Sequence, residues 1–283
     1  MSLATPLPLE RLCELTKVSR AGFYRWRNAP PAADTDMDLR DEIQRIAVEF
    51  NFYGWRRMHR ELQDRGWVVN HKRVRRIMRE DNLLCLRRKR FLVQTTNSKH
   101  NRPVYPNLAA ELTLTNIDQL WVADITYIRL ESEFVYLAVI LDAYSRRVIG
   151  WALERTLEDE LTIAALHMAL QTRVPAPGLV HHSDRGSQYA SHDYTALLKE
   201  HGIRISMSRK GNPYDNSKCE SFMKTLKYEE VHQQEYRDIE EARASIGHFV
   251  TKIYNQKRLH SALEYVSPAK FEEVLGKSKT PVA

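Results

Sequence analysis

The sequence HHSDRGSQY, residues 181–189, places one acid, Asp184, where a short apolar stretch ends. The preceding GLV predicts a buried strand, and Arg185 and Gly186 predict a tight turn after it. An isolated aspartate at such a place is usually a turn former. It can instead carry chemistry if other carboxylates share the site, so the positions of the other acids decide between the two interpretations.

A second acid, Asp124, lies inside the strand-like segment QLWVADITYIRL, residues 119–130. A charged group among so many apolar residues is costly unless it meets a partner or a metal ion. If this strand and the strand that ends at Asp184 are parallel neighbours, their carboxylates converge at one place on the sheet. Either aspartate alone fits a turn residue or a paired structural acid, and their convergence is what indicates a site.

A third acid follows in RKGNPYDNSKCESFMKTLK, residues 209–227, which begins as a loop and continues as a helix. Residues 215–217, DNS, are typical of a helix start and are interpreted as caps. The helix places Glu220, Lys224 and Lys227 along one stripe, because residues four and seven apart share a face. This stripe suits metal ions at the acid and phosphates beside the lysines. Taken alone, a surface Glu–Lys pair worth about a few tenths of a kcal/mol explains it more simply.

Strands and helices alternate around these acids. Three strand-like segments joined by short turns predict an antiparallel meander, and later segments alternate between helix and strand. The strands are expected at 119–130, 133–145, 146–155, 178–184 and 203–208, and the helices between them at 157–173 and 191–202. This order predicts an α/β fold, a mixed five-stranded sheet flanked by helices.

Basic residues are concentrated in the first third of the chain. The sequence has 283 residues, 43% of them hydrophobic, and a formal net charge of +7. Residues 1–106 hold 22 Lys and Arg against 12 Asp and Glu, whereas residues 107–283 hold 21 against 24. This asymmetry predicts a polyanion-binding module ahead of a larger domain, although charge alone fits a merely basic surface about as well.

The basic third contains two predicted helical modules. Residues 9–27 indicate two short helices around a turn, with Ser19 as the cap of the second. Residues 70–82 predict a helix capped by Asn70, and its outer positions are basic, with no acid before Glu80. The basic positions are Lys72, Arg73, Arg75, Arg76 and Arg79. Such a surface suits DNA phosphates along a groove, whereas a merely solvated helix face usually includes acids.

The cysteines and apolar runs indicate the compartment. Cys13, Cys85 and Cys219 are far apart and form no CxxC pair, so neither a disulfide framework nor a zinc site is expected. No apolar run is long enough for a membrane span, and the N-terminus lacks the apolar segment of a secretory signal. We therefore expect a cytoplasmic protein without membrane contact.

Several segments together resemble one family. In order along the chain they are WVADITY, LDAYSRRVIGW, HHSDRGSQY, GNPYDNSKCESFMKTLK and YNQKRLHSALEYVSPAKF. They are similar to the retroviral-integrase-like core of bacterial insertion-sequence transposases, of the OrfB type encoded in a second reading frame. The segment YGWRRMHRELQDRGWVVNHKRVRRIMRE resembles the helical DNA-binding module of that family. The resemblance covers nearly the whole chain.

The resemblance implies a ribonuclease-H-like catalytic core with an Asp-Asp-Glu triad. The triad residues would be Asp124, Asp184 and Glu220, and the last two lie 36 positions apart, an interval typical of the family. Lys227 matches a basic residue that the family uses near the DNA end. Two departures do not touch the triad: Leu259, where relatives often have proline, and Cys219, where a small residue is common.

The resemblance also implies the organisation of the chain. We expect a small helix-turn-helix-like module at 1–30, a helical DNA-binding domain at 36–92, a basic and polar linker at 93–112, and the catalytic core at 113–275. We expect DNA contacts from the basic residues of the 70–82 helix and from Lys224 and Lys227.

Carboxylate oxygens suit Mg²⁺ or Mn²⁺, and two such ions assist in-line phosphoryl displacement. The expected enzyme nicks the ends of an insertion element and joins the freed 3′-hydroxyl to DNA. His181 and His182 could lie behind the acids, although strand histidines are more often packing residues.

Two alternatives stay open. A ribonuclease-H-type nuclease without strand transfer would not need the basic N-terminal modules. A DNA-binding regulator with an inactive core would not need three acids.

For the transposase, the expected partners are double-stranded DNA, further copies of the chain on that DNA, and an upstream reading-frame product or fusion, since no heptad run is visible here. The expected location is the cytoplasm of a bacterium, at the nucleoid.

Overall fold

The computed structural model describes residues 8–28, 36–83, 102–209 and 213–278. Two short helices, α1 (Leu9–Thr16) and α2 (Arg20–Arg27), form the first module. Ser19 closes the turn between them, because its hydroxyl accepts a hydrogen bond from the Gly22 amide at 3.0 Å. This confirms the predicted pair of helices and the cap. Cys85 and the basic run at 87–90 lie outside the described residues.

Three further helices form what we call the helical domain, residues 36–83. They are α3 (Met37–Glu49), α4 (Trp55–Asp64) and α5 (His71–Glu80). Ile43, Met58 and Val74, one from each helix, are fully buried in a shared apolar core. Asn70 caps α5 as predicted, since its side chain accepts a hydrogen bond from the Lys72 amide at 2.8 Å.

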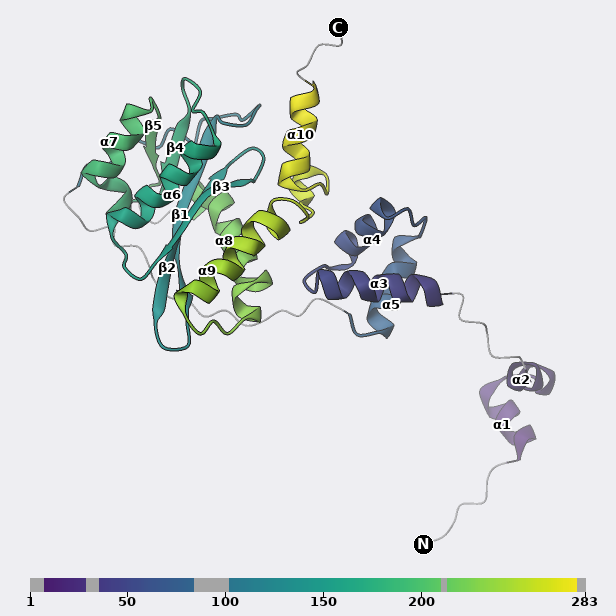
Figure 1. Ribbon diagram of the computed structural model, residues 1–283. Coiled ribbons are helices and arrows are strands. Elements are labelled where there is room, and N and C mark those ends of the chain that lie inside the picture. Colours follow the sequence, from purple (N-terminus) through teal and green to yellow (C-terminus); the bar gives the residue numbers. More distant parts are fainter. Residues whose placement is uncertain (1–7, 29–35, 84–101, 210–212, 279–283) are drawn as a thin grey trace.

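One mixed sheet forms the centre of the sheet domain, residues 102–278 (Figure 1). Its strands are β1 (Leu120–Arg129), β2 (Phe134–Asp142), β3 (Val148–Glu154), β4 (Val180–Ser183) and β5 (Arg204–Met207), in the order β3-β2-β1-β4-β5. The first three strands are antiparallel neighbours, whereas β4 is parallel to both β1 and β5. The predicted α/β fold with a mixed five-stranded sheet is confirmed.

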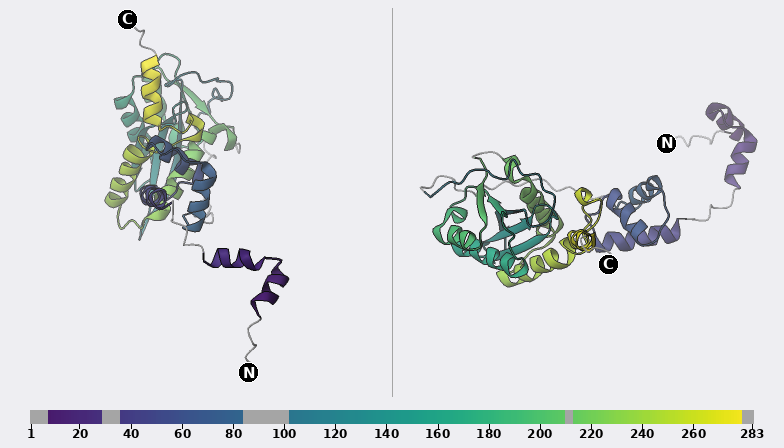
Figure 2. Two further views of the ribbon diagram at one scale, coloured as in Figure 1. Left: turned by 90° about the vertical axis from the view of Figure 1, so that its right-hand side faces the viewer. Right: turned by 90° about the horizontal axis from the view of Figure 1, so that it is seen from above.

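Helices cover both faces of this sheet (Figure 2). One face carries α6 (Asp159–Thr172) and α7 (His192–Glu200). The other carries α8 (Ser217–Glu229), α9 (Ile239–His248) and the π-helical turn η4 (Phe249–Tyr254). The last described helix is α10 (Pro268–Ser278). Within the described ranges, no helix is both long and apolar enough to cross a membrane.

Residues 102–112 differ from their predicted role as part of a linker. The Leu108 amide donates to the Ser206 hydroxyl of β5 at 2.8 Å. Tyr105 and Leu108 pack against the apolar clusters on opposite faces of the sheet. The segment is therefore part of the sheet domain, and its polar composition obscured this because only a few of its side chains face the core.

The helical domain contacts the sheet domain through residues 257–265. Leu259 is 6% exposed and lies in the apolar core of α3, α4 and α5. Its amide donates to the Tyr53 hydroxyl at 3.3 Å, and Lys257 forms an ion pair with Glu49 at 2.7 Å. Proline has no amide hydrogen, so the departure from the family pattern at Leu259 makes this hydrogen bond available.

Leu259→Ala is expected to weaken the contact between the two domains. Truncation of a buried leucine loses apolar burial and leaves a cavity, at a cost of about 2–5 kcal/mol. Differential scanning calorimetry should show the lowest unfolding transition moved to lower temperature. The matched control is Leu112→Ala, at a position that is 38% exposed, and it should leave that transition in place. An unshifted transition in Leu259→Ala would contradict the assignment of this contact.

Candidate active site

Asp124 and Asp184 lie level with each other on neighbouring strands. The parallel pairing of β1 with β4 aligns Val122 with His182. Continued by two residues, this register sets Asp184 beside Asp124. Because side chains alternate along a strand, Asp124 shares the face of Val122, which is the face that α8 covers. The predicted convergence required β1 and β4 to be parallel neighbours, and they are.

A tight turn holds the Asp184 carboxylate. Its Oδ1 accepts a hydrogen bond from the Gly186 amide at 2.9 Å, and the Arg185 side chain donates to the Ser208 carbonyl at 2.8 Å. A Cβ on residue 186 would lie 3.0 Å from Asp184 Oδ1, so glycine lets the turn close around the carboxylate. One oxygen of Asp184 thus stabilises the turn by accepting this hydrogen bond, and the bond fixes the position of the carboxylate beside β1.

The helix α8 begins at Ser217, within the predicted helix start at residues 215–217, and carries Glu220 on its first turn. The expected cap is wrong in detail, because the Asn216 side chain makes no capping hydrogen bond. Its amide nitrogen donates instead to the Ala123 carbonyl at 2.9 Å. A side-chain amide that satisfies a strand carbonyl attaches the start of α8 to β1, next to Asp124.

Asp124 has a strongly perturbed pKa. Burial raises the pKa of its carboxyl to about 8, and the negative charges of Asp184 and, less strongly, Glu220 add to the increase. A hydrogen bond from the Ile125 amide to Oδ1, at 2.9 Å, and the positive charge of Lys227 oppose it. The acids at the end of β4 and on α8 therefore both act on the acid of β1.

Two buried groups next to the acids feel the same charges. Burial raises the pKa of the Tyr189 phenol and of the Cys219 thiol, and the negative charges of Asp124 and Asp184 raise both further. Among the residues described, the Tyr189 hydroxyl has no hydrogen-bond partner. Sequence reasoning missed Tyr189, because nothing in the spacing of a tyrosine shows that its hydroxyl lies near two aspartates.

The donor set fits a hard divalent cation. Carboxylate oxygens are the ligands that Mg²⁺ and Mn²⁺ prefer, and a cation would offset the repulsion that raises the pKa of Asp124. The buried Tyr189 hydroxyl offers a further polar group at the same place. In the part of the chain that the structure describes, no three His, Cys, Asp or Glu side chains are grouped closely enough to hold a metal ion. Asp184 and Glu220 thus act electrostatically on Asp124, but the described acids are not grouped as a ligand cage.

The two lysines of α8 have different environments. Lys224 Nζ lies 3.6 Å from Glu220 Oε2, and its side chain is 54% exposed, which is the ordinary surface pair considered above. Lys227 is half-buried, with Nζ 4.1 Å from the centroid of the Tyr127 ring. Burial lowers the pKa of Lys227, and the charge of Asp124 opposes that shift. Lys227 is therefore a desolvated cation beside the acids rather than a surface lysine.

His181 and His182 are packing residues. A ring nitrogen of His181 lies 2.9 Å from the Tyr194 hydroxyl, and the His182 ring contacts the hydroxyls of Ser206 and Ser208 at 2.8 and 3.0 Å. Burial lowers the pKa of His181 to about 3 and that of His182 to about 4. Both rings are therefore neutral near pH 7, and their hydrogen bonds join β4 to its neighbours.

The basic residues of α5 fall into two groups. Arg73 Nε donates to Asp36 Oδ1 at 2.5 Å, and Arg76 pairs with the same carboxylate and with Glu80. These two positive charges are partly neutralised inside the domain. The other three are exposed and, within the described chain, have no ion-pair partner: Lys72, Arg75 and Arg79.

Comparisons with known proteins define the class. Models described as "Integrase core domain" match residues 115–213 and 201–268, and a model described as "HTH-like domain" matches residues 34–91. The first two matches contain all three acids, and the third contains α3, α4 and α5. The chain thus contains an integrase core, which belongs to a class of DNA phosphoryl-transfer enzyme.

Relatives extend the match to almost the whole chain. The chain is 39% identical over 267 residues to "Insertion element IS600 uncharacterized 31 kDa protein" of Shigella sonnei, covering 93% of this chain and 97% of that one. It is 34% identical over 270 residues to "Transposase InsF for insertion sequence IS3A" of Escherichia coli (strain K12), covering 93% of each. The crystal structure of the catalytic core domain of BIV integrase is 19% identical and covers 58% of this chain and 99% of that one, with a TM-score of 0.42. The chain belongs to the IS3 family of insertion-sequence transposases.

Proposed function

We propose that this chain moves DNA by polynucleotidyl transfer, nicking the ends of an insertion element and joining the freed 3′-hydroxyl to DNA. The observation that carries the proposal is that Asp124 and Asp184 lie level on neighbouring strands and that the charges of Asp184 and Glu220 act on Asp124, in a chain of a transposase family. The unpaired basic residues of α5 supply a surface for the DNA duplex.

Asp124, Asp184 and Glu220 would hold two ions of Mg²⁺ or Mn²⁺. Such ions, when bound, stabilise charge on the attacking and leaving oxygens of an in-line displacement. The Asp184 turn and the hydrogen bond from Asn216 to β1 fix the backbone positions from which the acids would converge on the ions and the reacting phosphate. Lys227 places a desolvated positive charge beside Asp124, where it can contact a phosphate oxygen.

Both steps exchange one bond at phosphorus for another. Nicking replaces the bond to the 3′ oxygen with a bond to the oxygen of water, which leaves a 3′-hydroxyl and a 5′-phosphate. Strand transfer replaces the bond between a target phosphorus and its 3′ oxygen with a bond to the freed 3′ oxygen of the element, and the target strand is left with a 3′-hydroxyl. Neither step requires a covalent intermediate between protein and DNA.

Purified protein, a labelled duplex carrying the ends of its element, and Mn²⁺ test this function. Single-strand nicks together with joined products support transposition. Cuts without joined products would identify a nuclease instead. A bandshift without cuts would identify a DNA-binding regulator with an inactive core.

The family suggests partners for this activity. We infer that several copies of the chain act together on double-stranded DNA in the bacterial cytoplasm, with an upstream reading-frame product or a fusion to it. Light scattering of the protein, alone and on a duplex carrying the element ends, tests the assembly.

Replacing Lys72, Arg75 and Arg79 with alanine is expected to weaken DNA binding and make it less sensitive to salt. Each lost phosphate contact lowers the slope of log affinity against log salt by about 0.9, so the triple variant should lose about three. The matched control is Arg73→Ala with Arg76→Ala, which should change the slope less because Asp36 and Glu80 already pair with these charges. Fluorescence anisotropy across a salt series measures both, and equal slope losses would contradict the division of α5 into two groups.

A further inference from the structure

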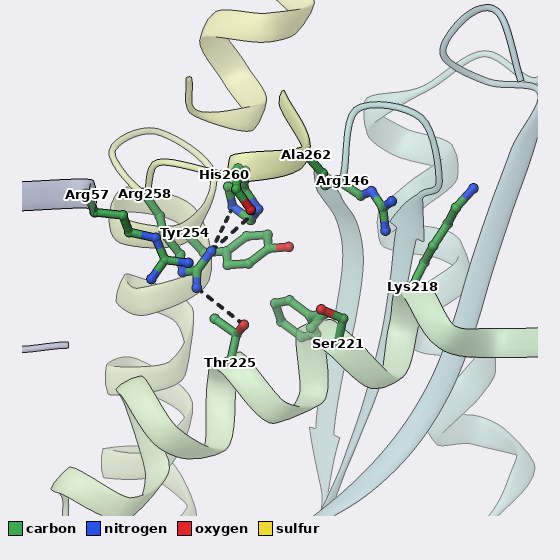
Figure 3. Close-up of a pocket in the computed structure, with 11 residues that line it drawn as sticks. Arg57, Arg146, Lys218, Ser221, Thr225, Tyr254, Arg258, His260 and Ala262 are labelled. Atoms are coloured by element: carbon green, nitrogen blue, oxygen red, sulfur yellow. Dashed lines mark hydrogen bonds between the residues drawn. The ribbon is translucent and has the colours of Figure 1, made fainter. Parts of the chain in front are cut away.

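A second cluster of basic side chains lines a cavity beside α8 (Figure 3). The cavity has a volume of about 210 Å³. It lies among α8, the turn between β2 and β3, residues 254–262 and the helical domain. The lining contains no carboxylate and includes four cationic side chains: Arg57, Arg146, Lys218 and Arg258.

Only part of this positive charge is neutralised. Glu229 accepts hydrogen bonds from Arg258 at 2.6 Å through both of its oxygens and lies 3.6 Å from Arg57. Arg146 and Lys218 are half-buried, and within the described ranges neither has an ion-pair partner. Burial lowers the pKa of Arg146. Because a partly buried, unpaired charge is costly, an anion in this cavity would be stabilised.

Neutral donors complete the lining. Burial, followed by the positive charges of Arg258, Arg57 and Arg146, lowers the pKa of His260 to about 2, so its ring is neutral near pH 7 and keeps one N–H donor. The Thr225 hydroxyl accepts from Arg258 at 3.4 Å, which leaves its own hydrogen to donate. Guanidinium groups with hydroxyls and an N–H are the donors that proteins direct at phosphate oxygens.

We propose that this cavity binds a backbone phosphate of the DNA, separate from the phosphate that is cut. The inference rests on the proposed function, because it requires DNA at Glu220. Lys218 and Glu220 lie two residues apart on α8 and therefore point to different sides of the helix, so a duplex whose cut strand reaches Glu220 can extend around the start of α8 to the cavity. Arg57 comes from α4 and Arg146 from the sheet domain, so the phosphate would be held by both domains at once.

Arg146→Gln combined with Lys218→Gln tests the site, because glutamine keeps length and polarity but removes the charge. Anisotropy of a labelled duplex over a salt series should show a slope lower by about one, the value for one phosphate contact. The matched control is Arg155→Gln with Arg237→Gln, whose side chains are 59% and 77% exposed, and it should keep the wild-type slope. An unchanged slope in the cavity variant, or an equal loss in the control, overturns the proposal.

Inorganic phosphate provides a second measurement that needs no variant to fold. The melting temperature of the wild-type protein should rise in sodium phosphate relative to sodium chloride of equal ionic strength, and the cavity variant should lose this rise. No rise in the wild type overturns the site. A rise together with unchanged DNA slopes identifies a site for a free anion and overturns the DNA assignment.

A nicking assay with Mn²⁺ on the same preparations separates this inference from the proposed function. Nicking by the wild type, with equal salt slopes for wild type and cavity variant, removes only the inference. A wild type that neither binds nor nicks DNA removes the proposed function and the inference together.

Discussion

Replacing Asp184 with asparagine is expected to reduce nicking and joining by about 10²-fold or more, the usual cost of losing one preorganised charge-stabilising group. DNA binding should stay nearly unchanged. Asparagine keeps the volume and one carbonyl oxygen, so the Gly186 amide can still donate to it, as it now does to Oδ1 at 2.9 Å. The turn therefore survives, and the variant removes only the negative charge that Asp184 presents to Asp124.

A time course with a labelled duplex in Mn²⁺ measures the nicking rate, and anisotropy measures the affinity. The matched control is Asp193→Asn, whose side chain is 79% exposed, and it should keep the wild-type rate. If Asp184→Asn nicks within about tenfold of the wild type, the assignment of Asp184 to the catalytic triad is wrong.

Lys227→Ala is expected to reduce end processing by roughly 10²-fold or more, because small misplacements of a reacting phosphate are expensive. The Lys227 ammonium is half-buried over the Tyr127 ring and acts electrostatically on Asp124. A cation held in this way is positioned to contact DNA beyond the scissile phosphate. The three acids remain in the variant, so stabilisation of the fold by Mn²⁺ should persist.

Thermal unfolding with and without Mn²⁺, and nicking on the same preparation, test this prediction. Lys224→Ala is the control, because Lys224 is 54% exposed and forms only a surface pair with Glu220. Such pairs contribute about 0–1 kcal/mol, so its loss should affect the rate far less. Normal nicking and joining by Lys227→Ala would contradict this prediction and show that Lys227 has only a packing role.

The place of the two aspartates could be predicted from the sequence because each carries a local signal. Asp124 is a charge inside an apolar strand, and Asp184 follows a buried strand directly before Arg185 and Gly186. The order of strands and helices is compatible with these two strands as parallel neighbours, which they are. The register of that pair then sets the two carboxylates level with each other. The resemblance supplied Glu220, which local pattern alone would have assigned to a surface pair.

Partners that are distant in sequence could not be predicted. Asp36 pairs with Arg73 and Arg76, although a pattern of basic residues on one helix says nothing of an acid from another segment. The cavity beside α8 joins side chains numbered 57, 146, 218 and 258, each of which resembles an ordinary surface cation by itself. Such sites exist only after the domains have packed.

The contact of Leu259 with the helical domain also fixes the distance between the DNA-binding helix α5 and the acids. On the proposed function, α5 holds the DNA while the acids act on it, and the bodies that carry them meet where the Leu259 amide reaches the Tyr53 hydroxyl. The number of base pairs between the bound sequence and the cut is then a dimension of the folded protein. Side-chain packing between the two domains fixes this number of base pairs, and the number of residues that join the domains does not.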